Sequence, residues 1–225
     1  KRQHLFFASQ FQLERYTYNK IKSNENDFER DINDFFKNGG VGLNVTVPFK
    51  GLAYNLCDEL DQSAGLCKSV NTVLIDSGKL IGHSTDGQGL IDDFLHKEIT
   101  LEDSKILIIG AGGSAASIIS SLLFHGKIKE ISILNRTKSN ALRLLDLFET
   151  NRLLMHEEGD EYDIVINTTP ISMNVDDIIL PPELIMNKPI CYDLFYDKEK
   201  TLFQKWAEKN AVSYTHLTLP TTHGV

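Results

Sequence analysis

The sequence has few cysteines, no long hydrophobic run and no excess of basic residues. Its 225 residues include three cysteines, which are too few and too scattered for a disulfide framework or a zinc ribbon, so we expect structural thiols in a reducing cytoplasm. No window approaches the roughly 18 uncharged apolar residues of a membrane-spanning helix, which excludes such a span. The net charge of −8 argues against nucleic acid or an anionic membrane as the main partner. We therefore predict a cytoplasmic globular protein without a metal site, in which any anionic ligand needs a local basic site.

Hydrophobic periodicity predicts an α/β protein with two halves. In the first half we expect a β-like segment at 16–21, an acidic amphipathic run at 25–36, a strand at 41–47, a helix at 50–60, a hairpin of 70–75 with 79–82, and a helix at 86–95. In the second half we expect strands at 106–109, 130–134, 164–167 and 190–194, with helices at 115–124 and 139–148. This alternation is typical of a doubly wound parallel sheet of the Rossmann type. We predict an α/β domain over 1–95 and a dinucleotide-binding domain over 101–212.

A glycine loop directly follows the predicted strand at 106–109. Gly110, Gly112 and Ala115 occupy the three positions of the pattern G-x-G-x-x-[GA]. The pattern needs a tight turn at the first position, close backbone approach to a pyrophosphate at the second, and a small side chain at the third. A helix-packing turn is the alternative. We expect the following residues to contact the cofactor: Gly110, Ala111, Gly112, Gly113, Ser114 and Ala115.

The end of the second Rossmann strand favours NADP over NAD. An acidic residue there would bind the ribose hydroxyls of NAD, whereas this sequence has Asn135, Arg136 and Thr137. A guanidinium can pair with a 2′-phosphate, and the threonine can donate a hydrogen bond. Arg136 could instead be a solvated surface residue. Thr168, at the end of the strand 164–167, is expected near the ribose or nicotinamide, with a plain turn as the alternative.

A cluster of polar residues is predicted in the first half. Period-two alternation places Asn44 and Thr46 on one face of a strand, and Lys50 follows just beyond the strand end. Asn71 adds an amide, and Asp86 brings a carboxylate to the start of a helix. Asp86 could simply cap that helix, and Lys50 could be an ordinary surface lysine.

Together these segments resemble the shikimate dehydrogenase family. The matching segments follow the family's order over nearly the whole chain: 44–50, 69–73, 82–89, 110–116, 135–137 and 192–201. The resemblance implies reversible reduction of 3-dehydroshikimate to shikimate with NADPH, a step toward chorismate and aromatic amino acids. It implies Lys50 and Asp86 as the catalytic pair, because the alkoxide formed by hydride delivery needs a nearby proton donor. It also implies these substrate contacts: Asn44, Thr46, Asn71 and Tyr196.

The sequence departs from the family pattern at several places. The chain opens at Lys1 without Met and without a visible targeting signal. It is expected to begin after the two serines with which the family binds the substrate carboxylate. At the other end, residues 213–225 resemble a non-native tail. Ser84 replaces the family's usual Asn, and Asn140 replaces a second basic residue near the 2′-phosphate. We therefore expect NADPH binding with poor turnover in this chain and activity in a longer parent. An NAD-using quinate/shikimate dehydrogenase, a cofactor-binding module with little turnover, and a homodimer all stay open.

Overall fold

The chain forms two compact units, Lys1–Val41 and Gly42–Val225. The computed structural model describes residues 17–125, 127–169, 180–195 and 200–216. In the first unit, helix α2 (Phe28–Lys37) buries Phe28, Ile32 and Phe36, which recur every four residues as expected of an amphipathic helix. Gly39 has a φ of +88°, a backbone conformation that ends the helix at low cost for glycine.

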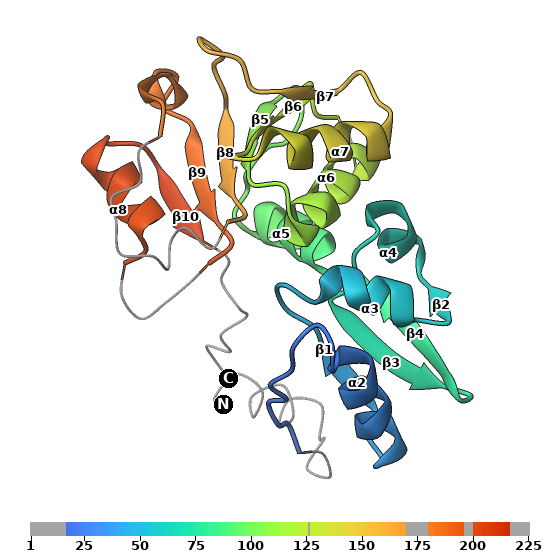
Figure 1. The fold of residues 1–225 in the computed structure, drawn as a ribbon. Coiled ribbons are helices and arrows are strands. Elements are labelled where there is room, and N and C mark those ends of the chain that lie inside the picture. The colour runs from blue at the N-terminus through green and yellow to red at the C-terminus, as the bar shows by residue number, and fades with distance from the viewer. Residues whose placement is uncertain (1–16, 126, 170–179, 196–199, 217–225) are drawn as a thin grey trace. The chain divides into compact units, whose positions relative to one another are not determined.

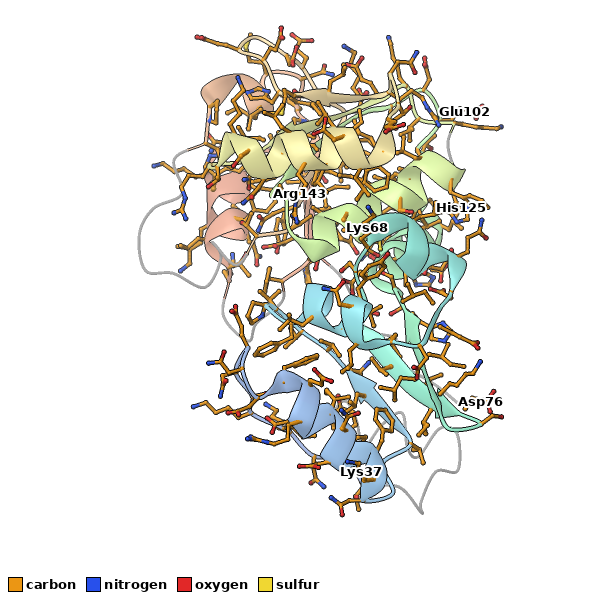
Figure 2. The ribbon with its side chains drawn as sticks, turned by 45° about the vertical axis from the view of Figure 1, so that its right-hand side comes forward. Lys37, Lys68, Asp76, Glu102, His125 and Arg143 are labelled. Atoms are coloured by element: carbon orange, nitrogen blue, oxygen red, sulfur yellow. The ribbon has the colours of Figure 1, made fainter. Side chains whose placement is uncertain are left out.

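The second unit begins with a four-stranded mixed sheet in the order β1-β3-β4-β2 (Figure 1). Its strands are β1 (Gly42–Asn44), β2 (Glu59–Leu60), β3 (Thr72–Asp76) and β4 (Lys79–His83). Its helices are α3 (Lys50–Leu56) and α4 (Gln62–Cys67), and α5 (Asp86–His96) follows the sheet. Strands β3 and β4 form the predicted hairpin, because Ser77 and Gly78 both adopt positive φ values in the turn beside Asp76, labelled in Figure 2.

In the first half one predicted β-like segment is wrong, and one predicted strand and one predicted helix are shorter than expected. Residues 17–21 carry no strand, since neither sheet pairs with them. The strand predicted at 41–47 covers only Gly42–Asn44, because the chain then turns and the Phe49 amide donates to the Thr46 carbonyl. The helix predicted at 50–60 ends at Leu56, because the following residues extend alongside β4 and form β2.

A six-stranded parallel sheet follows in the order β10-β9-β8-β5-β6-β7. Its strands are β5 (Lys105–Ile109), β6 (Glu130–Leu134), β7 (Leu153–Met155), β8 (Ile164–Asn167), β9 (Ile190–Asp193) and β10 (Tyr214–His216). Its helices are α6 (Gly113–His125), α7 (Lys138–Phe148), η2 (Pro182–Ile185) and α8 (Leu202–Lys209). All neighbouring strands run parallel, which confirms the predicted doubly wound sheet.

Both faces of the parallel sheet are buried, because alternate strand residues enter two different cores. Ile106 and Ile108 of β5 pack in one cluster with residues of α5, α6 and α7. Leu107 and Ile109 pack in a second cluster with residues of η2 and α8. The near-continuous apolar run of β5 is therefore typical of a central parallel strand covered on both sides.

The edge strand β10 begins within the segment that we predicted to be non-native. Tyr214 pairs with Cys191, and the Cys191 amide donates to the Ser213 carbonyl, so this part of the chain extends the parallel sheet. Residues 217–225 lie outside the described part of the chain. The domain limits that we expected, 1–95 and 101–212, and the non-native tail stay predictions.

Candidate active site

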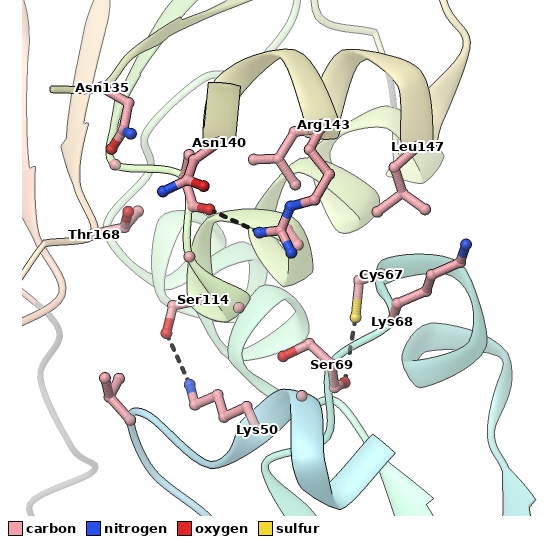
Figure 3. Close-up of a pocket in the computed structure, with 18 of the residues that line it drawn as sticks. Lys50, Cys67, Lys68, Ser69, Ser114, Asn135, Asn140, Arg143, Leu147 and Thr168 are labelled. Carbon is pink, nitrogen blue, oxygen red and sulfur yellow. Dashed lines mark hydrogen bonds between the residues drawn. The ribbon is translucent and has the colours of Figure 1, made fainter. Parts of the chain in front are cut away.

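A cavity of about 730 Å³ lies beside the carboxyl ends of β5 and β8. The chain order of the parallel sheet reverses between these two strands, and ligands of doubly wound folds bind at that point. The cavity is lined by the glycine loop, by the loop after β8, by the first turns of α3 and the end of α4, and by α7 (Figure 3). Its volume falls within the range of small-molecule and cofactor sites.

The glycine loop has the geometry that a dinucleotide needs. Gly110 adopts a φ of +116°, and a Cβ atom there would clash with Thr168 Oγ1. A Cβ on Gly112 would meet no atom within 4 Å, so the backbone at this position is open to close approach by a ligand. Ala115 is fully buried, as the third position of the motif requires. These three positions behave as the sequence pattern predicts, and the residues present fit a pyrophosphate at the start of α6.

The Lys50 ammonium lies at the centre of a polar cluster beside this loop. Its Nζ donates to Asp86 Oδ2 at 2.5 Å and to Ser114 Oγ at 2.8 Å, the second contact drawn in Figure 3. Asn71 Nδ2 donates to the other carboxylate oxygen, Asp86 Oδ1, at 2.6 Å. Lys50 is only 8% exposed, so it is not an ordinary surface lysine.

Helix α5 holds Asp86 in this cluster through contacts with neighbouring elements. The Gly87 amide and the Ser84 hydroxyl both donate to Ser117 Oγ of α6, at 3.0 and 2.8 Å. Further along α5, Asp93 Oδ2 accepts a 2.5 Å hydrogen bond from the buried Tyr192 hydroxyl of β9. Burial raises the pKa of Tyr192, which keeps this hydroxyl protonated as a donor. Asp86 occupies the first turn of α5, but its oxygens bind side chains of other elements, so simple helix capping does not describe its role.

The structure describes two of the other predicted substrate residues, Asn44 and Thr46. Asn44 and Thr46 are both exposed on either side of the buried Val45, which agrees with the period-two face predicted for them. Neither residue lines the cavity. Tyr196 lies outside the described residues.

The end of β6 contributes one of its three predicted cofactor residues to the cavity wall. Asn135 lines the cavity and donates to the Thr137 carbonyl at 2.8 Å. Arg136 and Thr137 are exposed and do not line it. Arg143 of α7 does, and its Nη2 lies 3.5 Å from the Ala111 carbonyl of the glycine loop.

Sequence reasoning missed four polar residues of the cavity wall: Lys68, Ser69, Arg143 and Asp146. Arg143 follows Asn140 by three positions and therefore lies on the same face of a helix, a spacing that could have identified it. Lys68 and Arg143 are labelled in Figures 2 and 3. Together with Lys50 they place three cations on the cavity wall, although the net charge of the whole chain is −8. Asp146 is the acidic residue of the lining. The balance of these charges favours an anionic ligand.

The loop after β8 is held from beneath by buried polar groups. Asn167 Nδ2 donates to Asp193 Oδ1 at 3.0 Å, and Asn167 Oδ1 accepts from the Thr169 amide and hydroxyl. Thr168 lines the cavity, but its hydroxyl donates to the Ile109 carbonyl at 2.9 Å. In this structure Thr168 therefore fixes the turn against Gly110, while its contact with a cofactor stays a prediction.

Neither a reactive thiol nor a metal cluster is found in the described part of the site. Cys67 lines the cavity, but burial raises the pKa of its thiol and disfavours the nucleophilic thiolate. The described residues contain no group of three metal-binding side chains. Within the same ranges, no helix is long and apolar enough to cross a membrane.

The parallel sheet and its glycine loop define a Rossmann-type α/β protein, and the paired Lys50 and Asp86 lie beside that loop. Residues 4–73 match the family model described as the shikimate dehydrogenase substrate binding domain, and residues 94–179 match that of shikimate / quinate 5-dehydrogenase. The chain is 36% identical over 211 residues to the shikimate dehydrogenase (NADP(+)) of Colwellia psychrerythraea, covering 92% of this chain and 76% of the relative. The chain belongs to the shikimate dehydrogenase family.

Two solved structures show how far the similarity extends in three dimensions. One is shikimate 5-dehydrogenase from Thermus thermophilus in complex with NADP(H) and shikimate. It has a TM-score of 0.80 and 25% sequence identity, and the match covers 94% of this chain and 79% of the Thermus chain. The other is shikimate 5-dehydrogenase from Listeria monocytogenes in complex with shikimate and NAD, with a TM-score of 0.79 and 26% identity, covering 95% and 79%. The first structure holds NADP(H) and the second holds NAD.

Proposed function

We infer that this protein catalyses the reversible, NADP-dependent interconversion of shikimate and 3-dehydroshikimate. The observation that carries this function is the buried Lys50 ammonium, which contacts both Asp86 and the first turn of α6 beside the glycine loop. We propose that a reacting carbonyl meets this ammonium as its proton donor beside the bound nicotinamide. When bound, NADPH supplies the hydride for reduction, and NADP⁺ accepts it in the reverse direction.

Lys50 and Asp86 act as one proton-transferring unit in this proposal. Negative charge develops on the carbonyl oxygen during reduction, and an ammonium held at 2.5 Å by a carboxylate can neutralise that charge and donate a proton. Asn71 fixes the second carboxylate oxygen and so holds Asp86 toward Lys50. In the oxidation direction, the same unit accepts the proton of the substrate hydroxyl. Asn44, Thr46, Asn71 and Tyr196 are proposed to bind the substrate.

The preference for NADP is proposed to depend on cations beside the end of β6. Arg136 is exposed and free to approach a 2′-phosphate, and Arg143 adds a guanidinium on the cavity wall near the Ala111 carbonyl of the glycine loop. Asn140, which also lines the cavity, carries no charge. No acidic residue occupies the three positions after β6, where NAD-binding folds of this type hold the ribose hydroxyls.

An NAD-using quinate/shikimate dehydrogenase is the second candidate function. The uncharged Asn140 favours it, since one cation fewer faces a 2′-phosphate than the family pattern provides. The cytoplasmic setting and a homodimer are further proposals, which cell fractionation and light scattering would test.

The test is a spectrophotometric assay at 340 nm that combines shikimate or quinate with NADP⁺ or NAD⁺. We expect turnover with shikimate and NADP⁺ to be poor in this chain and substantial in a version extended at both ends with segments of the Colwellia relative. Turnover mainly with NAD⁺ and quinate would support the second candidate. NADPH binding without turnover in either version would support a cofactor-binding module and contradict the catalytic role of Lys50 and Asp86.

A further inference from the structure

The Ser69 hydroxyl is buried without a partner beside the glycine loop. Ser69 is 2% exposed, and across the described residues its Oγ is the one buried side-chain nitrogen or oxygen atom with no hydrogen-bond partner. Other buried serines are paired: Ser104 donates to the Leu101 carbonyl at 2.6 Å, and Ser84 donates to Ser117. Because a buried hydroxyl without a partner destabilises a fold, its presence calls for an explanation.

The backbone around Ser69 is fixed by several contacts. Lys68 caps the end of α4 in the left-handed conformation at φ 49°. Hydrogen bonds then hold the backbone at Ser69 and at Val70. The Ser69 carbonyl accepts from the Cys67 thiol at 3.4 Å, and the Val70 amide donates to the Lys50 carbonyl at 3.0 Å. The position of the hydroxyl is therefore set by the packing of α3 and α4.

The hydroxyl faces the N-terminus of helix α6. A Cβ atom on Gly113 would lie 2.5 Å from Ser69 Oγ and 3.4 Å from the Lys50 side chain, so both approach the first residue of the helix closely. Ser69, Gly113 and Ser114 all line the cavity (Figure 3). The first amides of a helix have no partner within it and carry partial positive charge, so this position suits a phosphate.

We propose that Ser69 is a cofactor-binding residue whose hydroxyl donates a hydrogen bond to the pyrophosphate of the dinucleotide at the start of α6. This assignment rests on the proposed function. A bound pyrophosphate oxygen would satisfy the hydroxyl that the protein itself leaves unpaired. The site is thus prepared for its ligand at the expense of stability in the ligand-free protein.

The substitution Ser69→Ala tests this proposal because ligand affinity and stability should change in opposite directions. A hydrogen bond to a charged phosphate is worth roughly tenfold or more in affinity, so the Kd for NADPH should rise about tenfold. NADH should weaken by the same factor, because both cofactors share the pyrophosphate. The melting temperature of the ligand-free protein should stay unchanged or rise, since an unpaired buried hydroxyl is removed.

The matched control is Ser104→Ala, which removes a buried hydroxyl that is hydrogen-bonded and does not line the cavity. It should lower the melting temperature and leave the Kd for NADPH unchanged. Cofactor binding is measured by fluorescence titration with NADPH and with NADH, and unfolding by thermal scans without ligand.

The outcomes separate this assignment from the proposed function. If the unmodified chain binds NADPH and Ser69→Ala binds equally well, the role of Ser69 is wrong and the proposed function stands. A fall in melting temperature like that of Ser104→Ala would show a structural role and overturn the assignment. Loss of affinity for NADPH alone would place the contact at the 2′-phosphate and contradict the pyrophosphate assignment. Failure of the unmodified chain to bind either cofactor would overturn both.

Discussion

Replacing Lys50 with methionine should remove turnover while leaving the fold and substrate binding largely intact. Methionine keeps an unbranched apolar side chain in a buried position but deletes the ammonium that contacts Asp86 and Ser114. A positioned proton donor is commonly worth about 10²–10⁴ in rate, which corresponds to roughly 2.7–5.4 kcal/mol of transition-state stabilisation. We therefore expect kcat to fall by about that factor.

The cost of Lys50→Met in stability should be much smaller. Asp86 keeps its hydrogen bond from Asn71, and its side chain is 27% exposed, so solvent can reach the carboxylate left behind. A loss of about 1–2 kcal/mol is expected from the broken polar contacts, which would lower the melting temperature of a chain of this size by a few degrees. The variant should thus be folded at the assay temperature.

The assay is steady-state kinetics with shikimate and NADP⁺ on the version extended at both ends, accompanied by a thermal scan. The control is Lys79→Met, because Lys79 Nζ lies 2.5 Å from Glu59 in an ion pair whose two side chains are both more than half exposed. Exposed pairs contribute about 0–1 kcal/mol, so both kcat and melting temperature should hardly change. An unchanged kcat in Lys50→Met, or a rise in KM that accounts for the whole loss, would refute the proton-transfer role of Lys50.

Three further predictions follow from the same structure. Gly110→Ala should lower the melting temperature and weaken NADPH binding, because this position needs a positive φ and a Cβ atom there would clash with Thr168. The control is Gly65→Ala, at an open helical position, which should instead raise the stability by about 0.5–1 kcal/mol. Arg136→Ala should raise KM for NADP⁺ severalfold without changing KM for NAD⁺, and equal effects on both cofactors would contradict phosphate recognition. Burial raises the pKa of Cys57 to about 11. The rate of alkylation by iodoacetamide should therefore be low at pH 8 and should rise about tenfold per pH unit up to pH 10. Fast labelling at pH 8 would contradict this.

Some elements could not be predicted because they depend on contacts made elsewhere in the fold. Strand β2 has only two residues and exists because it pairs with β4. Helix α4, by contrast, could have been predicted, because Asp61 marks its start with a carboxylate that accepts from the Ala64 amide. Helix α8 likewise has a Thr201 cap that binds the Gln204 amide.

The candidate site divides in the same way. The glycine loop was predictable because a glycine at positive φ, an open backbone and a small buried residue are local demands. The contacts of Lys50 with Asp86 and Ser114 join residues 36 and 64 positions apart, and no local pattern specifies them. The cavity roles of Lys68 and Ser69 were missed for the same reason.

By itself, the sequence determined the α/β class, the parallel strands, the glycine loop and the residue types for acid–base chemistry, because periodicity and turn chemistry act over a few neighbouring residues. Its joint motifs also identified the family. Only the tertiary structure decided that the Lys50 ammonium is buried against Asp86 and α6, that Arg136 is exposed while Arg143 lines the cavity, and that Ser69 is left without a partner. These features depend on how helices and sheets pack across long stretches of chain, where burial and distance are set by the whole core rather than by adjacent residues.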